Sequence, residues 1–159
     1  MLQVDVQQAC SDPVPDEDDI RRWIEMALEG RTRLDQVEIS VKLVDQPEMQ
    51  TLNETYRGKQ GATNVLAFPA DLPVELDLPL LGDIVICAPV VAVEARDQGK
   101  SLEAHWAHMA VHGTLHLLGY NHVEEHDAIA MEALESAILR DLDFKNPYAD
   151  NTQQARNPS

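Results

Sequence analysis

Five of the six histidines of this 159-residue chain lie within one stretch, HWAHMAVHGTLHLLGYNH, at residues 105–122. The stretch is otherwise rich in apolar residues, among which a polar side chain is normally costly. At about 100° per residue of an α-helix, four of these histidines share one face: His105, His108, His112 and His116. A single histidine on such a face is usually a hydrogen-bonded core residue, but four in register indicate a shared chemical role.

The tightest spacing within the stretch is H-x-x-x-H-x-x-G-x-x-H, formed by His112, His116, Gly119 and His122. Two histidines four residues apart on a helix can direct their ring nitrogens at one cation, as in many zinc sites. Glycine readily ends a helix by reversing the chain, which would return His122 as a third ligand. Three neutral imidazoles leave one tetrahedral position open, as in catalytic zinc sites. The spacing therefore predicts one Zn²⁺ per chain on a helix and the turn after it, although imidazoles also accept nickel or copper.

Two neighbouring sets of residues limit the chemistry of this predicted site. Metzincin proteases share the spacing, but they carry a glutamate general base where this chain has Gly113, which argues against a protease. His105 and His108 precede the first ligand by two turns and one turn, where support of a ligand or packing is expected rather than ligation. Three residues beyond the third ligand are expected to cap the next helix: Glu124, Glu125 and His126.

Periodicity predicts the elements that position these histidines. Alternating or continuous apolar runs predict strands within residues 2–9, 37–45, 63–69 and 82–89. Helical spacing, with capping residues and glycines at the ends, predicts helices within residues 11–30, 46–58, 89–100, 101–119 and 124–142. Residues 70–81 contain prolines and are expected to form an exposed connection. The expected fold class is α+β, a mixed sheet of about four strands covered by helices.

Length and composition place these elements in one domain. We predict a metal-dependent hydrolase domain over residues 1–145 and a polar tail over residues 146–159. Cys10 and Cys87 lie far apart and are interpreted as small hydrophobic residues rather than a disulfide framework. No apolar run approaches the roughly 20 residues needed to span a bilayer, and the amino terminus lacks a signal peptide. The expected location is therefore the cytoplasm, without contact with a membrane.

The charge of the chain restricts how it could bind nucleic acid. The formal net charge is −16, from 28 acidic and 12 basic residues, which argues against a broad nonspecific grip on phosphates. Arg57 and Lys59 nevertheless lie beside glycines in the segment YRGKQG. An arginine near an open metal site suits bidentate contact with a phosphate, whereas alone it would be a surface residue at a helix end.

Taken together, these stretches resemble the YbeY family, the metal-dependent endoribonucleases of bacterial ribosomal RNA maturation. The matching segments occur in the expected order between about residues 50 and 135: LNETYRGK, TNVLAFP, LLGDIVIC, EAHWAHMAVHGTLHLLGYNH and MEALE. The resemblance implies an α+β fold, zinc bound by His112, His116 and His122, and Arg57 as the catalytic arginine. It departs from the family at Asn121, where aspartate is expected; asparagine keeps an acceptor oxygen for a ligand histidine but loses a charge.

The resemblance also implies a substrate and partners. The family acts on single-stranded RNA, including the 3′ end of the small-subunit ribosomal RNA, and in quality control of ribosomes. The small ribosomal subunit and its assembly factors are the implied partners. Two other classes stay open on the residues alone: a zinc hydrolase of a small molecule or peptide, and a noncatalytic ribosome-assembly module stabilised by its metal. The sequence also leaves open whether water or the RNA 2′-hydroxyl is the nucleophile.

Overall fold

The computed structural model describes residues 2–32, 36–70, 79–120 and 124–144. The elements in chain order are β1 (Leu2–Ala9), α1 (Glu17–Leu28), β2 (Val37–Val44), α2 (Gln46–Arg57), β3 (Val65–Pro69), β4 (Leu80–Cys87), α3 (Ala88–Asp97), α4 (Leu102–Leu117) and α5 (Glu125–Asp141). Each predicted strand and helix is confirmed. Two boundaries differ. β4 begins at Leu80 and so includes two residues of the predicted 70–81 connection, and α3 begins at Ala88, which the prediction assigned to the strand within 82–89.

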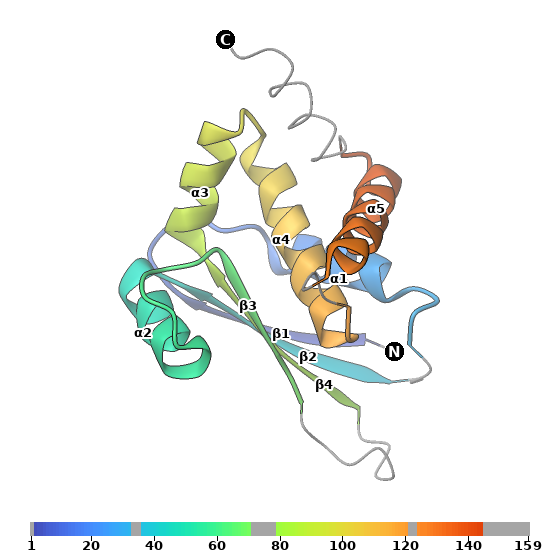
Figure 1. Ribbon diagram of the computed structural model, residues 1–159, viewed down its shortest axis with the longest axis horizontal. Helices are drawn as coiled ribbons and strands as arrows, with labels where there is room; N and C mark the ends of the chain where they lie inside the picture. Colours follow the sequence, from blue (N-terminus) through green and yellow to red (C-terminus); the bar gives the residue numbers. More distant parts are fainter. Residues whose placement is uncertain (1, 33–35, 71–78, 121–123, 145–159) are drawn as a thin grey trace.

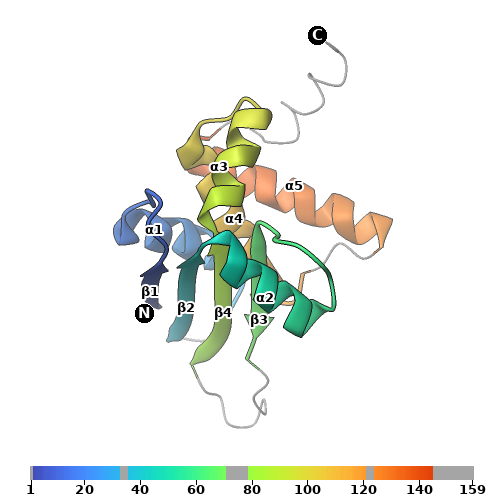
Figure 2. The same cartoon turned by 90° about the vertical axis from the view of Figure 1, so that its left-hand side faces the viewer.

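The four strands form one mixed sheet in the order β1-β2-β4-β3 (Figure 2). β1 pairs with β2 and β2 with β4 in parallel, whereas β3 runs antiparallel to β4. The early start of β4 follows from this pairing, since Leu80 lies opposite Glu38 just before a register shift in β2. The predicted class, α+β with a mixed four-stranded sheet, is confirmed.

Helices cover the two faces of the sheet unequally. α1, α3, α4 and α5 gather on one face, with α4 against the sheet, while α2 covers part of the other face at the β4 and β3 end (Figures 1 and 2). The larger core lies under α1 and α4 and contains Trp23, Trp106, Ile84 and Ile86. A smaller core under α2 contains Met49, Leu66 and Val85. Alternation in β3 and β4 explains the division, because successive side chains point to opposite faces.

α4 is the helix on which the predicted site depends, and it is buried on nearly all sides. Its N-terminus is capped by Ser101, whose Oγ accepts a hydrogen bond from the Ala104 N–H at 3.1 Å, as predicted. At the other end Gly119 has a φ of 100°, a value that L side chains rarely adopt, so glycine reverses the chain where predicted. Within the described residues, no helix is long and apolar enough to cross a membrane.

Candidate metal centre and cleft

The four histidines of α4 form a continuous row along one face of the helix. Successive ring centroids, from His105 through His108 and His112 to His116, lie 6.0, 6.3 and 4.5 Å apart. His105 and His108 are only 2% and 7% exposed, whereas His112 and His116 are half-buried. The row therefore runs from the interior of the helical layer toward solvent, and its outer two members are the predicted ligands.

A buried carboxylate from α5 connects two members of the row. The Oε1 atom of Glu135 accepts hydrogen bonds from His108 Nε2 at 2.8 Å and from His112 Nδ1 at 3.0 Å. Glu135 is 1% exposed, and burial by itself would raise the pKa of its carboxyl. The hydrogen bonds from His108 and His112 outweigh that effect and lower the pKa to about 2. Glu135 is thus a carboxylate held in the core by two imidazole donors.

This hydrogen-bond pattern fixes which nitrogen of each imidazole bears hydrogen. Burial lowers the pKa of His108, so its ring is neutral. Its Nε2 atom carries the hydrogen and donates to Glu135, while its Nδ1 atom, without hydrogen, lies 3.5 Å from Lys100 Nζ. His112 donates to Glu135 from Nδ1, and in the neutral ring this leaves the lone pair on Nε2. Carboxylates that orient ligand histidines in this way recur in zinc sites.

The Nε2 atoms of His112 and His116 lie 3.0 Å apart. Two nitrogens bound to one tetrahedral zinc at about 2.0 Å would be about 3.3 Å apart, so the observed separation is close to that of two ligands of one cation. The third predicted ligand, His122, and the neighbouring Asn121 lie outside the described residues. Among the described residues no group of three candidate donors forms a complete site. The pair of imidazoles therefore fits part of the predicted metal site.

The ligand pair opens into a cleft of about 420 Å³ between α4, β3 and the end of α2. Its lining includes Arg57, Lys59, Asn64, His112 and His116. The two constellations that the sequence kept separate, the histidine row and the YRGK segment, are thus brought together. In a chain with a net charge of −16, this cleft places two cations beside two imidazoles, as an anionic substrate would require.

Arg57 is held in place by β3. Its Nη2 atom donates a hydrogen bond to the Ala67 carbonyl at 2.8 Å, and its guanidinium lies 5.6 Å from the centre of the Phe68 ring. The bond to Ala67 uses one of the five N–H groups of the guanidinium, so donors remain for a ligand in the cleft. The αL conformation of Gly58, at a φ of 65°, ends α2 directly after Arg57.

Gly113 lines the cleft between the two predicted ligands, where a metzincin protease would carry its glutamate. A Cβ atom at this position would lie 2.9 Å from Ile84 Cγ2, closer than ordinary contacts allow. A side chain at position 113 would therefore require the buried Ile84 side chain to shift. This packing explains the glycine and agrees with the argument against a protease.

A second carboxylate contacts the inner end of the row. Glu94 Oε1 accepts a hydrogen bond from His105 Nε2 at 2.8 Å, and the Asn64 amide donates to both Glu94 oxygens at 3.1 and 3.3 Å. Burial lowers the pKa of His105, and its Nδ1 atom has no hydrogen-bond partner among the described residues. Since Asn64 lines the cleft, Glu94 connects the inner end of α4 to the cleft wall.

Sequence reasoning did not single out Glu135, although a signal was available. The buried residues of α5 are Met131, Glu135, Ile138 and Leu139, so a carboxylate stands in an otherwise apolar stripe. Such a residue needs a partner, because an unpaired buried charge is strongly unfavourable. The stripe could have identified Glu135 as a functional residue, but it could not have shown which histidines Glu135 contacts.

The prediction that residues 124–126 cap α5 is only partly met. Glu124 is the N-cap residue, but its side chain makes no capping hydrogen bond, and Glu125 is the first residue of the helix. The His126 side chain is exposed and lies 3.4 Å from Asp127 Oδ1. Glu125 still stabilises the start of α5, because an acidic residue in the first turn interacts favourably with the helix dipole.

The fold and the cleft define a class of protein: a small α+β protein with paired histidines and an arginine in one groove. The family model described as Endoribonuclease YbeY matches residues 5–143. An Endoribonuclease YbeY of Pseudomonas entomophila (strain L48) is 55% identical over 152 residues, covering 95% of this chain and 96% of that protein. Another, from Stutzerimonas stutzeri (strain A1501), is 51% identical over 155 residues, covering 97% of this chain and 96% of that protein.

The chain belongs to the YbeY endoribonuclease family, as predicted from its motifs. The class of enzyme expected from the resemblance, an endoribonuclease, is confirmed with it. A solution structure of TM1509 from Thermotoga maritima has the same fold, with a TM-score of 0.60 and 21% identity over 97% of this chain and 93% of that one. At that identity the structural likeness supports the fold alone.

Proposed function

We propose that this chain is a metal-dependent endoribonuclease that cleaves single-stranded RNA in ribosomal RNA processing, including maturation of the 3′ end of small-subunit ribosomal RNA and quality control of ribosomes. The observation that carries the proposal is the meeting of Arg57, His112 and His116 in one cleft, in a chain of the YbeY family. The small ribosomal subunit and its assembly factors would present the RNA, in the cytoplasm.

In this proposal one Zn²⁺ is held by His112, His116 and His122. Glu135 supports the assignment, because it holds the Nδ1–H of His112 and leaves Nε2 to bind the cation. A bound divalent cation would supply positive charge for a phosphate oxygen and would lower the pKa of water in the cleft. His108 shares the Glu135 carboxylate and so helps to keep that carboxylate in position.

Arg57 is the proposed catalytic residue. Its anchorage on the Ala67 carbonyl and the Phe68 ring limits the positions of the guanidinium before substrate arrives. A guanidinium fixed in this way can contact two phosphate oxygens and neutralise the charge that builds up as the phosphodiester bond breaks. Lys59 lines the same cleft and adds a second, more flexible cation for the RNA backbone.

The acidity of the chain is compatible with an RNA substrate if binding is local. Arg57 and Lys59 lie in the cleft, while the net charge of −16 disfavours contact with long duplexes. A short single-stranded segment could enter the cleft without laying many phosphates on the acidic exterior. Docking on the ribosome, rather than a broad basic surface, would then provide selectivity for the cleavage site.

The other two classes receive less support. A metzincin-type peptide hydrolase would need a general base at position 113, but Gly113 supplies no side chain, and a Cβ atom there would crowd Ile84. A noncatalytic assembly module would need no arginine aimed into the cleft from a fixed anchor. Membership of an endoribonuclease family favours catalysis over both alternatives.

The decisive experiment is cleavage of an end-labelled single-stranded RNA by highly purified protein, with zinc content measured for every sample. His116→Ala is expected to lose both zinc and cleavage. Arg57→Ala is expected to keep its zinc and fold but to cleave roughly 10²- to 10³-fold more slowly, as found when a charge-stabilising donor is removed.

Arg22→Ala is the matched control for Arg57→Ala, because Arg22 is an exposed arginine on α1 with only a 3.9 Å contact to Asp19. It should cleave at the wild-type rate. Equal cleavage by wild type, His116→Ala and Arg57→Ala would mean a contaminating nuclease and would favour the assembly module. Turnover of small esters or peptides that ignores Arg57→Ala would favour the small-molecule hydrolase.

The ends of the RNA products identify the nucleophile. A 2′,3′-cyclic phosphate would mean that the 2′-hydroxyl of the substrate attacks, and would exclude attack by water. Products with a free 2′-hydroxyl and a single terminal phosphate, formed without a cyclic intermediate, would assign the attack to water. Mass spectrometry of a short cleaved oligonucleotide distinguishes the two.

A further inference from the structure

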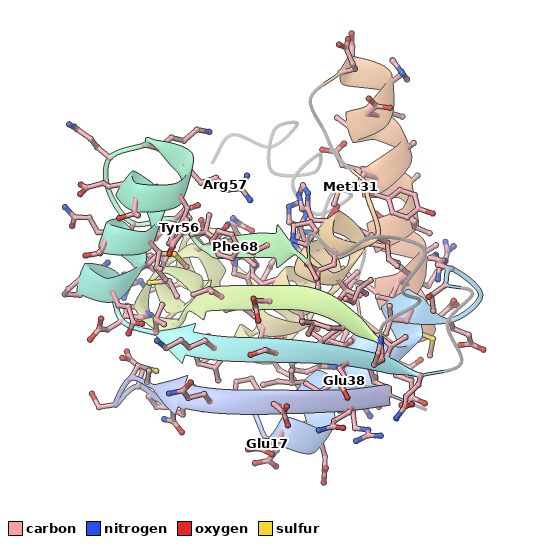
Figure 3. All side chains as sticks on the ribbon, turned by 90° about the horizontal axis from the view of Figure 1, so that it is seen from below. Glu17, Glu38, Tyr56, Arg57, Phe68 and Met131 are labelled. Atoms are coloured by element: carbon pink, nitrogen blue, oxygen red, sulfur yellow. The ribbon has the colours of Figure 1, made fainter. Side chains whose placement is uncertain are left out.

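Two aromatic side chains meet at the end of α2, next to the cleft. Tyr56, in the last turn of α2, and Phe68, on β3, are in edge-to-face contact with ring centroids 5.4 Å apart (Figure 3). Tyr56 is 64% exposed, more than any other large hydrophobic residue in the described part of the chain. Packing of the core therefore does not account for the position of this ring.

Arg57 links the aromatic pair to the cleft. Its guanidinium lies over the Phe68 ring at 5.6 Å and also lines the cleft that contains His112 and His116. Figure 3 shows the Tyr56, Arg57 and Phe68 side chains together where α2 meets β3. Because the Phe68 ring lies close to both the Tyr56 ring and the Arg57 guanidinium, a ligand held by the guanidinium would lie next to the aromatic pair.

The surroundings of the two rings differ chemically from the cleft. Tyr56 and Phe68 border a hollow of about 360 Å³ on the more open face of the sheet, which is also lined by Gln7, Ser40 and Asp83. The basic residue in its lining, Lys42, forms an ion pair with Glu48. An amide, a hydroxyl and a carboxylate suit the edges of a nucleobase, whereas the carboxylate repels a phosphate.

From this arrangement we propose that Tyr56 and Phe68 form a stacking subsite for one unpaired base of the RNA, next to the phosphate held by Arg57. The inference rests on the proposed function and adds to it the way in which the enzyme selects single strands. Bases that are unpaired can turn outward and stack on aromatic side chains, whereas bases inside a duplex are already stacked and paired. The cleft would hold the backbone, and the aromatic pair would hold the base.

The test compares Tyr56→Ala with Tyr56→Phe, its matched control that keeps the ring. Both are assayed as metal-loaded protein with a fluorescent single-stranded RNA, by steady-state cleavage and by fluorescence anisotropy. Tyr56→Ala is expected to raise KM and Kd by about 5- to 100-fold, the usual contribution of one base–aromatic stack, while kcat changes by less than about twofold. Tyr56→Phe should resemble wild type, and the exposure of Tyr56 predicts unchanged thermal unfolding for both variants.

Substrates with a single abasic position locate the contact. At one position next to the cleaved bond, removal of the base should weaken RNA binding by wild type as much as Tyr56→Ala does. At that position the missing base should cause no further loss of RNA binding by Tyr56→Ala. The subsite would be overturned if abasic positions weakened RNA binding by Tyr56→Ala equally at every position. It would also be overturned if KM and Kd were unchanged in Tyr56→Ala.

The two proposals fail differently in these assays. If wild type cleaves the RNA but Tyr56→Ala binds and cleaves it normally, the subsite is wrong and the proposed function stands. If the RNA binds in a way that depends on Tyr56 but is not cleaved, the proposed function is wrong and the subsite stands. If wild type neither binds nor cleaves the RNA, both are wrong.

Discussion

Two carboxylate–imidazole pairs lie on the same face of α4, and they differ in their surroundings. At the inner end, His105 donates to Glu94 at 2.8 Å; one turn further on, His108 donates to Glu135, also at 2.8 Å. The Glu94 side chain is 32% exposed and takes its other hydrogen bonds from the Asn64 amide. Glu135 is 1% exposed and also accepts a hydrogen bond from His112.

The difference shows that an identical local contact can serve different purposes, depending on what the carboxylate contacts next. Glu94 joins α4 to the wall of the cleft through Asn64. Glu135 joins α5 to a predicted metal ligand, and both of its bonds to imidazole are shielded from water, where charge-assisted hydrogen bonds are stronger. The position of each pair along α4, rather than the pair itself, determines whether it lies next to the predicted metal ligands.

The largest expected effect that tests this comparison is on metal affinity. Glu135→Gln keeps a similar shape and an acceptor oxygen, but it removes the negative charge that would strengthen His112 as the proposed ligand. We expect zinc affinity to fall by about 10- to 100-fold, measured by competition with a chromophoric chelator. Glu94→Gln, the same substitution in the matching pair one turn away, should leave the affinity within about twofold of wild type.

Both variants need a check of the fold, because each alters a buried hydrogen bond. Circular dichroism and urea unfolding of the metal-free proteins provide it. Equal losses of zinc affinity in Glu135→Gln and Glu94→Gln would mean that the effect comes from general loosening of α4. Unchanged affinity in a folded Glu135→Gln would remove the distinction between the two pairs.

The sequence predicted more of α4 than of its partners, for physical reasons. The helix, its Ser101 cap and the common face of the four histidines follow from local periodicity and capping, which depend on residues near one another in the chain. The pairing of His112 with Glu135 joins residues 23 positions apart and depends on the way α5 packs across α4. Local patterns do not encode that packing, so the partner of a buried carboxylate could not be read from them.

The cleft illustrates the same limit. The sequence placed Arg57 at a helix end and His112 on another helix, and the family resemblance assigned both to one site. The anchor of Arg57 on Ala67 and Phe68 follows only from the position of β3 beside α2. The neighbouring exposure of Tyr56 could not be predicted either, because a tyrosine at the end of an amphipathic helix is often buried.

A smaller expected effect distinguishes the two ends of α4 by substitutions that alter the free energy of unfolding. Gly119→Ala would force an alanine to a φ of 100°, and since its Cβ would meet no atom within 4 Å, the cost is confined to the backbone. We expect a loss of about 1–3 kcal/mol in the free energy of unfolding. Ser101→Ala removes the cap at the other end and should cost about 1 kcal/mol.

Only the outer end of α4 should affect the metal. Gly119→Ala is expected to weaken zinc binding as well as stability, because the turn it distorts leads to His122. Ser101→Ala is expected to keep wild-type zinc affinity, since it lies beside the inner pair. Urea unfolding and chelator competition on the same samples measure both quantities, and zinc affinity lost in proportion to stability in both variants would contradict the assignment.

The smallest expected effect is a change in the pH dependence of stability at the inner pair. Burial lowers the pKa of His105 from its ordinary value of 6.5, and Lys100 and His108 act in the same direction, whereas Glu94 opposes them. As the pH falls through 6.5, His105 therefore binds a proton in the unfolded chain but not in the folded chain, so the free energy of unfolding decreases. His105→Gln keeps a donor for Glu94 but does not titrate in this range.

The stability difference between wild type and His105→Gln should consequently narrow as the pH falls from about 7.5 to 5.5, by a slope of at most about one proton. Urea unfolding at several pH values, with a chelator present so that zinc does not contribute, measures this slope. A difference that stays constant or widens toward low pH would mean that His105 is protonated in the folded chain. Glu94 would then hold an imidazolium, and the inner pair would be charged where the Glu135 pair has a neutral His108.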